Sequence, residues 1–432
     1  MLHIGGRLMA VICLVVLTCA GMDAAFAIER FPPPEFPQGY TIPTTTTPPP
    51  SAQILGYVDT LALALCLAAW LSLKRRSRRG VFLLTILSLL YFGFWRKGCV
   101  CAVGSVQDVA LAVFNHSYAV PLTVLLFFIL PLLAALLVGR VFCSSVCPLG
   151  AAQELVLFRP LKVPLWLEHA LGLLPFFYLG VAVLMAANGA AFIICQDDPF
   201  VAFFRLSGPV DAIVGGVVFL GISMFVGRAY CRFGCPYSVL LGLASRLSWR
   251  RVVITPDECV NCRLCEDACP FGAIRKPTPE GVFEHTEGKT RLALLVLLLP
   301  VLVAGMSWLG HLSGVGLARA NASVRLAELV RLDAKGAKDA AGEPSAELVA
   351  FRRTGCSEED LYRHASEIRS GFSKGGWFLG GWVGLVIGVK LISLSIRRRR
   401  EGYEADRSAC FACARCYSSC PKERQHIKSV VA

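Results

Sequence analysis

Long apolar runs divide this chain into a series of candidate membrane helices. An α-helix of about 20 apolar residues spans the hydrocarbon core of a bilayer. Runs close to this length occur at residues 53–73, 80–96, 120–139, 171–193, 210–227, 292–310 and 376–396. We therefore expect an all-α polytopic membrane protein with about seven transmembrane helices, the first five of which form a membrane domain at residues 53–250.

Basic residues lie at the ends of these runs and predict the orientation of the chain. Residues 74–79 read Lys-Arg-Arg-Ser-Arg-Arg and separate the first two runs. Loops of this kind stay in the cytoplasm. Because successive spans cross the membrane in alternate directions, we expect the cytoplasmic segments to be 140–166, 228–291 and the residues after 396. The loops expected in the periplasm are 97–119, 194–209 and 311–375.

The N-terminus predicts export. Arg7, the apolar stretch 8–20 and the small-x-small triplet 25–27 together resemble a signal peptide covering residues 1–27. Residues 28–52 are rich in proline and threonine, which predicts an extended periplasmic linker. The signal and the basic loops agree on a periplasmic mature N-terminus and a cytoplasmic C-terminus. We therefore expect a multi-pass protein of the bacterial inner membrane.

Composition and charge also indicate a membrane protein. Of the 432 residues, 55% are hydrophobic and only 17% are charged, whereas a typical soluble domain has about 25% charged residues. The net charge of +13 comes from Lys and Arg beside apolar runs, and no basic patch is interleaved with aromatic residues. This arrangement argues against a nucleic-acid partner.

Two cysteine runs carry the strongest chemical signal. The spacing CxxCxxCxxxCP is typical of bacterial ferredoxins, in which the thiolates hold 4Fe–4S clusters. It occurs at Cys259, Cys262, Cys265 and Cys269, and again at Cys410, Cys413, Cys416 and Cys420. Zinc is the alternative, because CxxC pairs also bind zinc, but zinc sites rarely show four cysteines in this spacing. We predict two 4Fe–4S clusters in cytoplasmic, ferredoxin-like α+β segments at 251–291 and 397–432.

The ligands of the two clusters can be combined in two ways. In paired ferredoxin runs the fourth cysteine normally binds the other cluster. Exchange would join Cys420 to the first three cysteines of the first run, and Cys269 to the first three of the second. In the alternative, each run closes on its own four cysteines. We favour exchange, because the helices 292–310 and 376–396 form a hairpin around the periplasmic segment 311–375.

A second repeat, GRxxCxxxCP, closes the third and the fifth apolar runs. Its copies carry Cys143 with Cys147 and Cys231 with Cys235. A four-residue step puts two side chains on one helix face. Two copies at cytoplasmic helix ends could therefore meet in a four-thiol site. The residues leave open whether such a site holds iron–sulfur, another metal or redox-active thiols, or whether the thiols are incidental.

Three further cysteines lie on the predicted periplasmic side. The segment from Cys99 to Gln107 resembles the segment from Cys147 to Gln153, and Cys195 begins a Cys-Gln-Asp-Asp-Pro sequence. An outer redox site built from Cys99, Cys101 and Cys195 is one interpretation. A disulfide or unrelated thiols are the others.

The order of these motifs resembles a known family. Paired GRxxCxxxCP motifs, a ferredoxin run, the basic stretch 397–400 and a final run at Cys410–Cys420 are similar to the NosR/NapH membrane polyferredoxins over residues 53–425. The resemblance is strongest to NosR and implies support of nitrous oxide reductase by electron delivery across the membrane. NosR-type proteins usually carry an outer flavin domain, but residues 28–52 are too few for one, and we expect no flavin in this chain.

We therefore expect an electron-transfer component and no stand-alone enzyme. No P-loop, dinucleotide-binding glycine pattern or nucleophile–base pair occurs, so no catalytic residue is assigned. Expected donors are quinol or a cytoplasmic protein, and the expected acceptor is a periplasmic flavoprotein or metalloenzyme. The alternative function is maturation or regulation, with clusters that sense redox state.

Overall fold

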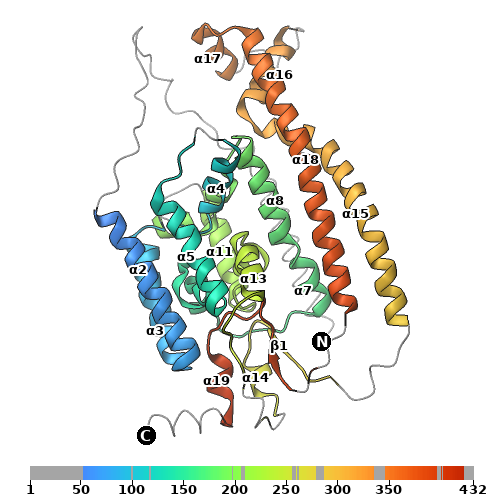
Figure 1. Cartoon of the computed structure of the whole chain (residues 1–432). Coiled ribbons are helices and arrows are strands. Elements are labelled where there is room, and N and C mark those ends of the chain that lie inside the picture. The colour runs from blue at the N-terminus through green and yellow to red at the C-terminus, as the bar shows by residue number, and fades with distance from the viewer. Residues whose placement is uncertain are drawn as a thin grey trace. The chain divides into compact units, whose positions relative to one another are not determined.

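The computed structural model describes residues 52–98, 101–115, 118–196, 198–205, 210–254, 259, 262–278, 287–334, 346–396, 400 and 402–422. The predicted signal peptide and nearly all of the predicted linker lie outside these residues, as does Cys99. The described part of the chain is mostly helical, as Figure 1 shows. Its membrane helices confirm the predicted helical fold class in outline.

The first half of the chain forms a bundle of helices around the two GRxxCxxxCP motifs. Its elements are α2 (Ala52–Ala69), η1 (Trp70–Lys74), α3 (Arg78–Ser88), η2 (Leu89–Trp95), α4 (Ser105–Phe114), α5 (Leu122–Val138), η3 (Phe142–Val146), α6 (Pro148–Leu155), α7 (Leu165–Leu171), α8 (Leu174–Ala187), α9 (Ile193–Gln196), α10 (Pro199–Arg205), α11 (Val210–Ser223), α12 (Ala229–Phe233) and α13 (Tyr237–Arg246).

The second half carries the ferredoxin runs and one long helix pair. Its elements are α14 (Leu264–Asp267), β1 (Ile274–Arg275), α15 (Glu287–Leu317), η4 (Ala318–Ala320), α16 (Ala322–Ala334), α17 (Ala346–Thr354), α18 (Glu358–Ser395), β2 (Glu404–Ala405) and α19 (Arg415–Ser419). The antiparallel strands β1 and β2 pair Ile274 with Ala405 and Arg275 with Glu404. This pairing joins the two ferredoxin runs, which are far apart in the sequence, into one small α+β module.

The number of membrane spans is lower than the sequence predicts. Among the described residues, five helices are long and apolar enough to cross a bilayer, and a sixth span forms if the bent pair α10–α11 is counted as one. The predicted run 120–139 becomes α5, which has 17 residues. A count of seven is therefore not confirmed, and the shortfall lies in the helices next to the cysteine motifs.

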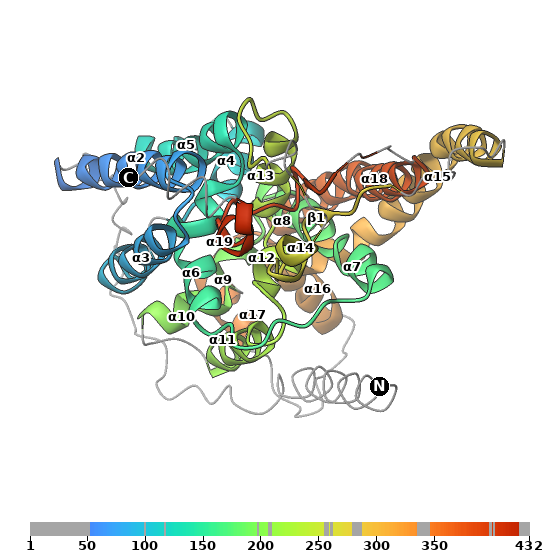
Figure 2. The same ribbon diagram turned by 90° about the horizontal axis from the view of Figure 1, so that it is seen from below.

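Two of the spans extend well beyond their predicted ends. Helices α15 and α18 lie side by side (Figures 1 and 2) and run for 31 and 38 residues. Their contact depends on glycines: a Cβ added at Gly380 would overlap the carbonyl oxygen of Met306, and one at Gly376 would overlap that of Gly310. Small residues at four-residue spacing let membrane helices approach closely. On α8, the carbonyl oxygen of Phe176 accepts a hydrogen bond of 2.9 Å from Trp382 Nε1 of α18.

We predict that Gly380→Leu separates α15 from α18, because the added side chain has no room beside Met306. The measurement is a disulfide cross-link between Ser307→Cys and Gly381→Cys, since a Cβ at position 381 would lie 2.8 Å from Ser307 Oγ. Gly380→Leu should abolish the cross-link. Gly305→Leu is the matched control, because nothing lies within 4 Å of a Cβ there. Equal cross-linking in both variants would refute this packing.

Candidate functional site

The chain turns back sharply at both GRxxCxxxCP motifs. Gly139 ends α5 with a φ of +81°, and Arg228 starts the second turn with a φ of +53°. At the second turn a glycine precedes the arginine, because a Cβ at Gly227 would lie 3.1 Å from the Pro270 Cβ. Both motifs therefore leave their helices and re-enter the bundle.

The re-entrant segments reach well into the bundle. The Thr85 hydroxyl donates to the Ser144 carbonyl oxygen at 3.5 Å, and the Tyr237 hydroxyl donates to the Phe128 carbonyl oxygen at 2.6 Å. Thr85 lies seven positions after Arg78, the first residue of α3, which is about 10 Å along a helix axis. The first motif therefore begins at the end of α5, as expected, but its turn carries the chain back beside the interior of α3.

The two thiols of each motif do not share one helix face as expected. Cys143 lies in η3, but Cys147 follows the last residue of that turn with extended backbone angles. Cys231 lies in α12, and Cys235 follows that helix. Each second cysteine precedes a proline, which disfavours helical geometry at the preceding residue. The proline of the motif thus ends the first helical turn and places the second thiol beyond it.

All four thiols of the two motifs are buried and gather in one place. Cys143, Cys147, Cys231 and Cys235 are between 4% and 7% exposed. Cys147 interacts electrostatically with each of the other three. The Gln153 side chain connects the motifs, because its Nε2 donates to Cys231 Sγ at 3.4 Å and its Oε1 accepts from the Tyr230 backbone N–H at 2.9 Å. The fold thus gathers the thiols of the two motifs in one buried region.

The donor set of the thiols fits iron–sulfur clusters. The cysteines of a cubane ligate separate iron corners through their thiolates. The four-thiol site and each ferredoxin run supply four cysteines, so the residues present fit such clusters.

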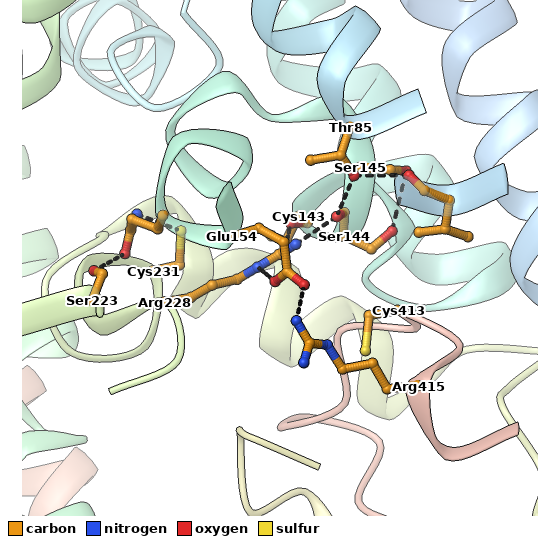
Figure 3. A network of polar contacts seen from close by, with 12 residues as sticks. Thr85, Cys143, Ser144, Ser145, Glu154, Ser223, Arg228, Cys231, Cys413 and Arg415 are labelled. Atoms are coloured by element: carbon orange, nitrogen blue, oxygen red, sulfur yellow. Dashed lines mark hydrogen bonds and ion pairs between the residues drawn. The ribbon is translucent and has the colours of Figure 1, made fainter. Parts of the chain in front are cut away.

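A buried carboxylate, Glu154, lies near Cys143 and binds both Arg228 and Arg415, as Figure 3 shows. Arg228 is fully buried, and its Nε lies 3.1 Å from Glu154 Oε2. The Arg228 guanidinium also donates to the carbonyl oxygens of Cys143 and Ser144. The arginine of the second motif thus fixes the backbone of the first motif.

The same carboxylate binds the second ferredoxin run. Arg415, between Cys413 and Cys416, places its Nη2 2.6 Å from Glu154 Oε1, and Arg78 of α3 binds the same oxygen. Burial alone would raise the pKa of Glu154, but the three arginines lower it to about 2. Its contribution to stability is therefore complete at neutral pH and is lost as the pH falls from its ordinary pKa of 4.5 toward 2.

The arginine of the first motif lies between the membrane thiols and the second run. Arg140 donates to the Ser408 carbonyl oxygen at 2.8 Å, and its guanidinium lies 4.4 Å from the centroid of the Phe411 ring. It interacts electrostatically with both Cys231 and Cys410. Its buried Nε and Nη2 have no hydrogen-bond partner among the described residues. Sulfide and thiolate are acceptors, so these unpaired donors fit an adjacent iron–sulfur cluster.

The two ferredoxin runs contain matching turns. Arg263 and Ala414, each directly after the second cysteine of its run, adopt left-handed backbone angles and precede the short helices α14 and α19. Across the module, the rings of Phe271 and Phe411 lie 4.8 Å apart. The runs thus form two related halves that pack against each other.

The fourth cysteine of the first run lies with the second run. Cys269 interacts electrostatically with Cys410, Cys413 and Cys416. In the first run, Cys265 interacts with Cys259 and Cys262. This placement favours the exchanged ligand arrangement. Burial raises the pKa of Cys410 to about 12, so a thiolate there needs a cation such as cluster iron.

Several residues of the site were not anticipated from the sequence. Glu154 is a single acidic residue in a short apolar helix, and Arg78 belongs to the basic loop that was assigned to membrane orientation alone. Gln153 was noted only as part of a sequence likeness. The signal that could have revealed Glu154 is its burial in an apolar segment, because an acidic residue in such a segment needs a basic partner.

Comparisons with known proteins agree with this chemistry. Residues 120–165 and 209–254, which contain the two GRxxCxxxCP motifs, match the model of a family described as a 4Fe–4S binding domain. Residues 252–275, which contain the first ferredoxin run, match a second family with the same description. These matches show an iron–sulfur protein.

Three relatives indicate to which family of iron–sulfur proteins the chain belongs. An uncharacterized protein of Methanocaldococcus jannaschii is 30% identical over 43% of this chain and 79% of its own length. YccM of Escherichia coli, whose name describes electron transport, is 32% identical over 32% of this chain and 43% of its own. The regulatory protein NosR of Stutzerimonas stutzeri is 30% identical over 49% of this chain and 31% of its own. This chain belongs to the NosR-like polyferredoxins.

This NosR-like polyferredoxin is an iron–sulfur electron-transfer protein of a membrane, and its predicted cofactor class is confirmed. Its match spans less than half the length of YccM and of NosR. No solved structure matches it.

We predict that Glu154→Gln detaches the second ferredoxin run of this NosR-like polyferredoxin from the bundle. Removing one partner of a buried ion pair costs about 3–5 kcal/mol, because the remaining charges stay buried and uncompensated. Hydrogen exchange should show lost protection in peptides from 402–422. The control is Asp360→Asn, which removes an exposed carboxylate bound to Arg363 and should cost at most about 1 kcal/mol. Equal protection in both variants would contradict the role of Glu154.

Proposed function

We propose that the protein carries electrons between the cytoplasm or the quinone pool and a periplasmic redox partner. The main observation is the contact between the second ferredoxin run and the four-thiol site. Arg140 interacts with a thiol of each, and Glu154 binds both Arg228 and Arg415. A short connection between two cysteine sites is what electron transfer requires, because the rate falls steeply with distance.

We assign the ligands by the exchange that is usual between paired ferredoxin runs, which the position of Cys269 beside the second run supports. The first cluster would be held by Cys259, Cys262, Cys265 and Cys420, and the second by Cys410, Cys413, Cys416 and Cys269. Cys143, Cys147, Cys231 and Cys235 would hold a third iron–sulfur centre, which the family match over both motifs supports. Iron–sulfur clusters supply one-electron transfer at potentials that their surroundings tune.

The protein side chains would tune and shield these centres. Arg140 and Arg228 bring positive charge beside the thiols, which favours the reduced state of a cluster. Phe271 and Phe411 cover the Arg228 guanidinium at 5.7 and 5.5 Å from their ring centroids. This apolar cover excludes water between the module and the bundle.

The proposed orientation places the ferredoxin module in the cytoplasm. The basic loop 74–79 lies on the module, because Arg76 lies over the Tyr417 ring and Arg78 binds the Cys413 carbonyl oxygen. A loop of this kind is expected on the cytoplasmic side. The predicted domain boundaries, the inner-membrane location and the periplasmic mature N-terminus belong to this proposal.

The partners are proposed by chemical class. The donor would be quinol or a cytoplasmic protein, and the acceptor a periplasmic flavoprotein or metalloenzyme. The likeness to NosR makes the nitrous oxide reductase system the first candidate. The alternative function is regulation or maturation, which is suggested by the name of the relative, the regulatory protein NosR.

A cysteine series tests the relay. Cys262→Ser and Cys413→Ser should each remove about four iron and four sulfide, because a hydroxyl is a poorer ligand than thiolate. Cys143→Ser with Cys231→Ser should remove the third centre with about four iron and four sulfide, and block reduction of the periplasmic partner while the ferredoxin clusters still bleach with reductant. Cys66→Ser, at an exposed position of α2, is the control.

Two outcomes of that series would contradict the relay. If the Cys143/Cys231 variant passes electrons at the wild-type rate, the four-thiol site is not on the path. If all cluster variants leave partner reduction intact and change only its expression or assembly, the regulatory function is correct.

Reporter fusions test the orientation. A reporter after Ala432 should be active only when it works in the cytoplasm, and one inserted near Ala340 should report the periplasm. Reversal of either result would place the ferredoxin module outside the cytoplasm.

A further inference from the structure

A second glutamine in the bundle repeats the role of Gln153 without its sulfur partner. Gln153 Oε1 accepts from the backbone N–H of Tyr230, the residue before Cys231, and its Nε2 donates to the Cys231 sulfur. Gln107 Oε1 accepts from the backbone N–H of Ile194, the residue before Cys195, at 2.9 Å. Gln107 is fully buried, and its Nε2 has no hydrogen-bond partner among the described residues.

The segments before the two glutamines match as well. Gln107 follows Cys101 by six positions with Gly104 halfway, and Gln153 follows Cys147 by six positions with Gly150 halfway. In both, the glycine backbone N–H donates to the cysteine thiol three positions earlier. A Cβ at Gly104 would lie 2.8 Å from Cys195 Sγ. The glycine therefore leaves room for the partner thiol.

The partner segments also correspond. Tyr230-Cys231 is followed by Cys235-Pro236, which opens α13, and Ile194-Cys195 is followed by Asp198-Pro199, which opens α10. The aspartate thus precedes the proline as the last cysteine of the four-thiol site does, but it follows Cys195 by three positions, whereas Cys235 follows Cys231 by four. Asp198 is 4% exposed and, with Cys195, interacts electrostatically with Cys101.

We propose that Cys101, Cys195 and Asp198 hold a further iron–sulfur cluster, on the far side of the four-thiol site from the ferredoxin module. The match to the four-thiol site assigns the same kind of cofactor, with a carboxylate in place of one thiolate. Sulfide or the Cys195 thiolate would accept the unpaired N–H of Gln107. Cys99, the remaining cysteine of this segment, lies outside the described residues, so the ligand set is assigned without it.

The inference rests on the proposed relay. In that relay, the outer site would receive the electron from the four-thiol centre. One cavity is lined by both Cys101 and Cys147, with Phe127 and Phe142 among its apolar walls. Buried Tyr230 interacts electrostatically with Asp198, Cys101 and Cys235. Loss of one electron would oxidise the four-thiol centre, and the same electron would reduce the outer cluster. Exposed Cys195 would then lie where a partner protein can take the electron.

A disulfide between Cys101 and Cys195 is the competing interpretation. Asp198 Oδ1 accepts from the Phe200 backbone N–H at 2.9 Å at the start of α10, but a disulfide would leave the buried Gln107 Nε2 without an acceptor.

The experiment uses full-length protein purified in detergent without air. Cys101→Ser with Cys195→Ser should lose about four iron and four sulfide relative to wild type, and an electron paramagnetic resonance signal of the reduced protein should disappear. Asp198→Cys, which restores the ligand type of the four-thiol site, should keep the iron content and shift that signal, whereas Asp198→Ala should lose it. Cys66→Ser is again the control.

Unchanged iron content in both the Cys101/Cys195 variant and Asp198→Ala would overturn the inference. A disulfide would also overturn it, and would be seen as a mass about 2 Da lower for unreduced than for reduced wild-type protein. Asp198→Cys guards against loss of folding as the cause, because it should retain iron. Iron loss in the Cys143/Cys231 variant, with none in the Cys101/Cys195 variant, would reject the outer site alone. No iron loss in the Cys143/Cys231 variant would reject the proposed relay itself.

Discussion

The structure of this site depends on one buried carboxylate. Glu154 forms ion pairs with Arg78, Arg228 and Arg415, which come from a membrane helix, a re-entrant motif and a ferredoxin run. Burying the Glu154 and Arg228 charges is unfavourable unless they are paired. The pairing is possible only when the three segments meet at one point, so the charge requirement itself fixes where the second run docks.

Docking at that point gives the two GRxxCxxxCP motifs related roles. The arginine of the first motif contacts the second ferredoxin run, and the arginine of the second motif holds the backbone of the first. The cysteines of the same motifs then lie deeper in the bundle, beside α3 and α5. Each motif therefore couples a thiol pair to the ferredoxin module, which explains why glycine and arginine belong to the repeat as much as cysteine does.

Local patterns were predictable from the sequence, and long-range contacts were not. The apolar run 120–139 gave α5 almost to the residue, because helix length and hydrophobicity are local properties. The re-entrant turns were missed because a four-residue cysteine step indicates one helix face, whereas Pro148 and Pro236 end the turn. The contact between Glu154 and Arg415 spans 261 positions, and no spacing rule connects residues so far apart.

The central claim is that the four-thiol centre and the cluster of the second ferredoxin run lie close together. Pulsed electron paramagnetic resonance on the fully reduced, anaerobic protein tests it directly through the magnetic coupling between the two centres. The account predicts a split or fast-relaxing signal that becomes a simple cluster spectrum when Cys143 and Cys231 are both replaced by serine. An uncoupled spectrum in the wild-type protein, identical to that of the variant, would contradict it.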